Sequence, residues 1–82
     1  MWLRAVPRMP YYDDPDYRAS VVASIKQRFG NVPVDVTLFE AFGIFDVQLD
    51  RQLESELSAL PLIGRVYPAV DREMTLGSRT VI

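Results

Sequence analysis

The chain has 82 residues, 49% of them hydrophobic and 24% charged, which is the composition of a folded globular protein rather than a disordered one. It contains no Cys and no His, which excludes disulfides and the usual zinc, haem and iron–sulfur ligand sets, so no cofactor is expected. Nine basic residues against eleven acidic ones give a net charge of −2, which argues against nucleic acid as a partner.

The first predicted elements are a strand and a long helix. Residues 2–6 are short and apolar, and prolines follow them, which is typical of a first or edge strand. Asp14 is then predicted to cap a helix that Pro15 begins and that Gly30 follows. Apolar residues recur at helical spacing along one face of this helix. They are Tyr17, Val21, Val22, Ile25 and Phe29.

Two strands, a shorter helix and a last strand come next. Apolar and polar residues alternate over 32–39 and again over 45–49, which is the pattern of half-buried strands. Asp50 is predicted to cap a second helix that Pro61 ends, and a final strand is predicted over 63–70. One core is expected between helices and sheet, made of Val21, Val22, Ile25, Phe29, Val34, Val36, Leu38, Val47, Leu49, Leu53, Leu57 and Leu60.

The order strand, helix, strand, strand, helix, strand is that of the split βαβ of the ferredoxin-like fold. We therefore expect an α+β two-layer sandwich in a single domain over 1–82, with a core over 1–71 and an extended C-terminal tail over 72–82. The tail ends in the strand formers Val81 and Ile82, which are expected to pair either with an edge of the same sheet or with another chain.

The stretch LFEAFGIF, residues 38–45, is apolar for a turn between two strands. Residues opposite each other in an antiparallel pair share a face of the sheet. Pairing Val36 with Leu49 and Leu38 with Val47 keeps all four on the core side. The turn of this hairpin then falls near the middle of the stretch, where glycine can adopt a positive φ.

At this hairpin tip the outer face of the sheet is predicted to carry Phe39, Phe42 and Ile44, away from both helices. We expect these three residues to form a protein interface with another chain, with Val81 and Ile82 as a second contact. Two alternatives stay open. In the first alternative, the tail folds back and covers the tip as a second small core. In the second, the two phenylalanines line a ligand pocket.

The stretch PYYDDPDY, residues 10–17, brings Asp13, Asp14 and Asp16 close together, as a site for Ca²⁺ or Mg²⁺ would. Helix capping and the helix dipole already account for Asp14 and Asp16, and the spacing lacks the longer ligand series of an EF-hand. The tyrosines of the stretch are expected to pack this loop onto the sheet or onto a neighbour. No metal site is expected.

Catalytic residues are not expected either. Without Cys and His, no Ser or Thr has the usual activating base, and the four glycines are too scattered to form a phosphate-binding loop. Glu40 near the tip is the one candidate for a general acid in an apolar site, and Arg51 or Arg65 would neutralise it. The sequence therefore predicts that the protein is not an enzyme.

We expect a non-catalytic structural or interaction subunit of a larger assembly, such as a phage particle or another multi-subunit machine. Its partners would be protein chains in a homo- or hetero-oligomer. No apolar run approaches the length of about 18 residues needed for a membrane span, so we expect no membrane association and a cytoplasmic or virion location. The alternative is a dimeric regulatory module that binds a small molecule between its subunits.

Overall fold

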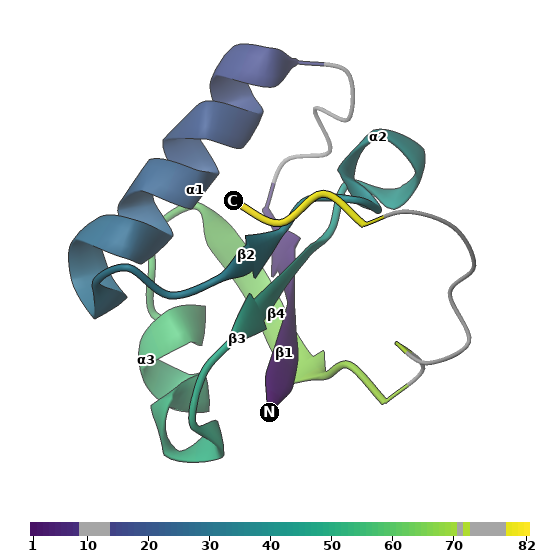
Figure 1. The fold of residues 1–82 in the computed structure, drawn as a ribbon. Coiled ribbons are helices and arrows are strands. Elements are labelled where there is room, and N and C mark those ends of the chain that lie inside the picture. The colour runs from purple at the N-terminus through teal and green to yellow at the C-terminus, as the bar shows by residue number, and fades with distance from the viewer. Residues whose placement is uncertain (9–13, 71, 73–78) are drawn as a thin grey trace.

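The computed structural model describes residues 1–8, 14–70, 72 and 79–82. Strands and helices alternate along these residues, and Figure 1 shows their arrangement. The elements in chain order are β1 (Trp2–Pro7), α1 (Pro15–Phe29), β2 (Val34–Asp35), α2 (Phe39–Phe42), β3 (Phe45–Gln48), the 3₁₀ turn η1 (Arg51–Leu53), α3 (Glu54–Ser58) and β4 (Ile63–Pro68).

The four strands form one sheet in the order β2-β3-β1-β4, and every neighbouring pair is antiparallel. Helices α1 and α3 lie on the same side of this sheet, as Figure 1 shows. The molecule is thus a small α+β domain with a four-stranded antiparallel sheet and three helices. Among the described helices, none is long and apolar enough to cross a membrane.

The core lies between the helices and one face of the sheet. Its buried residues from the predicted set are Val21, Val22, Ile25, Val34, Val36, Val47, Leu49 and Leu57, and Phe29, Leu53 and Leu60 pack against them while partly buried. Leu38 is half-buried. The prediction missed five further members of this core, which are Leu3, Ala5, Phe39, Phe45 and Ile63.

The long helix begins and ends where the sequence indicates. The Oδ1 atom of Asp14 accepts hydrogen bonds from the backbone N–H groups of Asp16 at 3.0 Å and of Tyr17 at 3.2 Å. These bonds satisfy two of the N–H groups that a helix start leaves without a partner. At the other end, Gly30 has a φ of 87° and its N–H donates to the Lys26 carbonyl at 2.8 Å. Asp14 as the N-cap and Gly30 as the residue that follows the helix are confirmed, but Gly30, with ψ −157°, does not take the left-handed helical conformation expected of it.

The predicted hairpin between β2 and β3 is wrong in its register. Val34, not Leu38, lies opposite Val47, and β2 ends at Asp35. The reason lies in the side chain of Asp35, whose Oδ1 atom accepts the backbone N–H of Thr37 at 2.9 Å and turns the chain out of the strand. The shift is an even number of residues, so the predicted core-side orientation of Val34, Val36 and Val47 still holds.

The predicted hairpin tip is a helical turn. Residues Phe39–Phe42 form α2, and Gly43 ends it in the left-handed conformation, with φ 68° and ψ 28°. The Gly43 N–H donates to the Phe39 carbonyl at 2.7 Å, which closes the turn. A short apolar run fits one helical turn as well as a strand, because its alternation is too brief to separate the two periods.

Candidate functional site

The structure separates the two phenylalanines of the predicted interface. Phe39 is only 2% exposed, and its ring packs on that of Phe45 with centroids 5.0 Å apart and the planes tilted by 40°. Its predicted position on an outer face is therefore wrong, since α2 turns it into the core of its own chain. Phe42 is 64% exposed, and Ile44 is half-buried. Of the predicted tip residues, Phe42 is the one that stands out into solvent.

The C-terminal residues lie along the outer edge of β2. The Val34 N–H donates to the Ile82 carbonyl at 3.1 Å, the Ile82 N–H donates back to the Val34 carbonyl at 2.7 Å, and Val81 lies opposite Asp35. The tail thus pairs with its own sheet, and Figure 1 shows it running beside β2. Val81 and Ile82 are each about half exposed, and their contact with another chain stays a prediction.

The other face of the sheet carries a row of buried charges. Arg4 on β1 lies opposite Asp46 on β3, and Asp46 lies opposite Asp35 on β2. The neighbours of each charged residue along its strand belong to the core, so these three side chains point away from the core, to the face that α1 and α3 leave uncovered. They are nevertheless only 3–5% exposed. Buried charges of this kind require partners, because desolvation otherwise disfavours them.

Those partners come from within the row and from the C-terminal segment. Arg4 makes a two-pronged ion pair with Asp46, from Nε to Oδ1 at 2.9 Å and from Nη2 to Oδ2 at 3.1 Å. The Nη1 atom of Arg72 lies 2.7 Å from Oδ2 of Asp46 and 3.0 Å from Oδ2 of Asp35. Nη1 of Arg79 lies 3.1 Å from Oδ2 of Asp35, and its Nη2 donates to the Arg72 carbonyl. Both carboxylates are therefore bound by two guanidinium groups each.

These interactions shift the pKa of the Asp35 carboxyl group. Burial of its carboxylate acts to raise the pKa, but hydrogen bonds from the hydroxyl and backbone N–H of Thr37, together with Arg72 and Arg79, more than offset burial. The pKa of Asp35 consequently lies below its ordinary value of 3.8. A carboxylate held ionised in this way is a structural anion, the opposite of a general acid.

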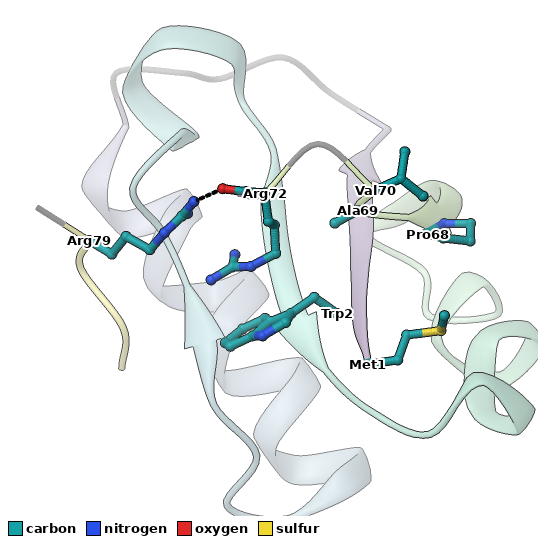
Figure 2. A pocket seen from close by; sticks show the side chains of 7 residues that line it. All are labelled: Met1, Trp2, Pro68, Ala69, Val70, Arg72 and Arg79. Atoms are coloured by element: carbon teal, nitrogen blue, oxygen red, sulfur yellow. Dashed lines mark hydrogen bonds between the residues drawn. The ribbon is translucent and has the colours of Figure 1, made fainter. Parts of the chain in front are cut away.

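A pocket of about 460 Å³ opens beside this charged network. Its walls include the apolar side chains of Met1, Trp2, Pro68 and Val70, together with Arg72 and Arg79, and Figure 2 shows these side chains around the opening. The Arg72 guanidinium lies over the Trp2 ring at 3.7 Å from the ring centroid, a cation–π contact that fixes its plane. The pocket and the ion pairs thus share two residues.

This network was not predicted from the sequence. A signal was present. Each of Arg4, Asp35 and Asp46 stands alone between two apolar residues of a strand, so opposite charges occupy equivalent positions on three strands. Their pairing, however, depends on the order of the strands. Nothing in the local pattern names Arg72 as the partner of both carboxylates.

The other candidates for chemistry do not gather into a site in the part of the chain that the structure describes. Glu40 is exposed, so it lacks the apolar surroundings that a general acid would need. Tyr11, Tyr12 and Asp13 of the acidic stretch lie outside the described residues. Within residues 1–8, 14–70, 72 and 79–82, no group of three or more acidic, His or Cys side chains is arranged to hold a metal ion.

Fold and site together define this protein as a small α+β domain with an ion-paired open sheet face. Comparison of the chain with known protein families, with curated proteins and with solved structures finds no match.

Proposed function

We propose that this protein is a non-catalytic interaction subunit that docks onto another protein chain in a larger assembly. The docking surface consists of Phe42 on α2 and of the C-terminal residues Val81 and Ile82, and we call it the β2-edge surface. It revises the surface expected from sequence by leaving out Phe39, which the core already buries, and Ile44, which is half-buried.

The observation that carries this proposal is the exposure of Phe42. An aromatic side chain that is 64% exposed on a four-residue helix makes little contribution to the fold, while Phe39 in the same helix is almost fully buried. Aromatic residues are enriched in the buried centres of protein interfaces, where their large apolar area is removed from water. Phe42 therefore has the properties of an anchor residue.

The C-terminal residues supply the additional contact that such an anchor needs. Burying Phe42 would contribute about 1.5–3 kcal/mol, whereas association costs about 4–15 kcal/mol in lost freedom of motion. One side chain is thus insufficient. Val81 and Ile82 are half-exposed and pair with the edge of β2, and α2 begins a few residues after β2 ends, so both parts of the surface flank the same strand.

The state of the two buried carboxylates supports a non-catalytic role. The two buried carboxylates are each held by two arginines, and the pKa of Asp35 is lowered, so it stays ionised. The chain has no Cys or His to serve as nucleophile or base.

We also propose that the domain has the ferredoxin-like topology. The support comes from the strand order β2-β3-β1-β4 with antiparallel neighbours throughout, and from the placement of α1 and α3 on one side of the sheet. In this assignment α2 is an insertion that replaces a tight β2–β3 turn.

The experiment compares Phe42→Ser/Val81→Ser with the wild-type chain. Sedimentation velocity of the purified protein measures self-association, and co-purification from native lysate at a fixed stoichiometry measures a different partner. We expect assembly of the wild type and its loss in the double variant, with an unchanged thermal melt. Assembly that survives both substitutions, or a wild type that stays monomeric and binds nothing, would contradict the proposal.

A matched pair of variants separates docking from folding. Phe39→Ala removes a buried ring and should cost about 3–5 kcal/mol of stability. Phe42→Ala removes an exposed ring and should change stability by less than about 0.5 kcal/mol while weakening assembly. If Phe42→Ala instead lowers the melting temperature of a monomer as strongly as Phe39→Ala, Phe42 serves the fold and the docking role is wrong.

A further inference from the structure

We propose that the pocket beside the charged network binds a small organic carboxylate with an apolar body. The described residues that line the pocket share none with the β2-edge surface, so this inference does not depend on docking through that surface. We call it the Trp2 pocket, after the aromatic residue in its wall.

The size and lining of the Trp2 pocket suit a small molecule. Its volume of about 460 Å³ lies within the range of about 300–1,000 Å³ that is usual for ligand sites. Apolar side chains from the start of β1 and the end of β4, which lie side by side, form part of its wall, and the cationic groups among the lining residues are Arg72 and Arg79, as Figure 2 shows. Many apolar contacts with a few directional polar groups are the usual composition of a ligand pocket.

The cations in the pocket wall favour an anion. Arg72 and Arg79 both line the pocket, and their side chains are only 13% and 23% exposed. In such a partly buried environment charges interact more strongly than in water.

Arg72 has the geometry to hold both oxygens of that carboxylate. Among the described residues, its contacts are made by Nη1, which bridges the two aspartates, and by the face of the guanidinium on Trp2. These contacts leave the N–H groups of Nε and Nη2 available to a ligand. The two groups are parallel donors on one edge of the planar guanidinium. Such an edge matches a carboxylate in two-pronged fashion.

Arg72 is also held in place before any ligand arrives. The stacking on Trp2 and the two ion pairs restrict its otherwise flexible side chain, so a ligand meets donors that are already ordered. Preorganisation of this kind lowers the entropic cost of binding. A freely rotating surface arginine would lack this advantage.

The test uses benzoate and its uncharged analogue benzamide. Trp2 is the single Trp of the chain, so its indole N–H gives one signal in a ¹H–¹⁵N spectrum and reports directly on the pocket. We expect benzoate to shift this signal saturably in the millimolar range. Benzamide should bind about tenfold more weakly, or worse, because it cannot form the charge-assisted pair.

Two variants show whether Arg72 is responsible. Arg72→Lys keeps a positive charge for the two aspartates, and the fold with it, but loses the paired donors, so benzoate affinity should fall about tenfold. Arg65→Lys is the matched control, since Arg65 lies over Tyr67 outside the pocket wall and should bind benzoate like the wild type. Both variants are first compared with the wild type by thermal melting.

The inference is overturned by any of four results. The first is that benzoate gives no saturable shift of the Trp2 signal, and the second is that benzamide binds as tightly as benzoate. The third is that Arg72→Lys keeps the wild-type affinity for benzoate. The fourth is that inorganic phosphate shifts the Trp2 signal while benzoate does not. The last outcome would assign the pocket to a phosphate rather than to a carboxylate.

Discussion

Asp35 and Asp46 lie directly opposite each other on the antiparallel strands β2 and β3, and one nitrogen of Arg72 lies within 3.0 Å of an oxygen from each. Like charges in this position destabilise a strand pair. This sheet tolerates them because a cation from the segment after β4 bridges them, while Arg4 and Arg79 bind one carboxylate each. The C-terminal segment is thereby tied to the centre of the sheet.

Removing this bridge should destabilise the domain. Arg72→Met leaves both carboxylates buried with one arginine each, and we expect a loss of about 1–3 kcal/mol in the free energy of unfolding. Urea titration followed by circular dichroism measures it. Arg65→Met removes an exposed arginine and should change stability by less than about 0.5 kcal/mol. Equal midpoints for the two variants would mean that the bridge has no energetic role.

The lowered pKa of Asp35 predicts a contribution to stability that depends on pH. The folded carboxyl binds its proton at lower pH than the unfolded one, whose pKa is 3.8, so the contribution is complete above about pH 5 and is lost as pH falls through the folded pKa. The stability difference between the wild type and Asp35→Asn should therefore shrink below about pH 4. Urea midpoints at neutral pH and at several acidic pH values measure this difference, and a constant difference would refute the assignment.

The cap of α1 gives a third prediction. Asp14→Ala removes the acceptor for two backbone N–H groups and should cost about 1 kcal/mol, whereas Asp14→Ser keeps a capping oxygen and should cost much less. Added Ca²⁺ or Mg²⁺ should leave the wild-type melting temperature unchanged. A rise in melting temperature at micromolar cation would show that the acidic stretch binds metal.

Hydrogen exchange can test whether the tail pairs with β2 in solution. Deletion of residues 80–82 removes the acceptors of the Val34 and Val36 N–H groups, and these two amides should exchange faster by on the order of tenfold. The Gln48 N–H, which donates to the Pro33 carbonyl at 3.1 Å, serves as the internal control and should keep its protection. Unchanged exchange at Val34 and Val36 would mean that the tail does not hold this edge in solution.

The sequence by itself determined the elements whose signals are local. Asp14, Pro15 and Gly30 mark the ends of α1 because capping involves residues within a few positions of one another, and Asp50 caps η1 by accepting the Gln52 N–H for the same reason. The inward faces of the strands were also correct, because alternation survives a register shift of an even number of residues.

Tertiary structure alone decided the rest. Phe39 is buried and Phe42 exposed because a turn at Asp35 converts the expected hairpin tip into a helix, and a short apolar run does not distinguish these conformations. Arg4 and Asp46 are 42 residues apart in the chain, and they meet through the order of the strands. Arg72 joins them through the path of the C-terminal segment. Contacts of this kind are selected by the energy of the whole fold, so they leave no periodic pattern in the sequence.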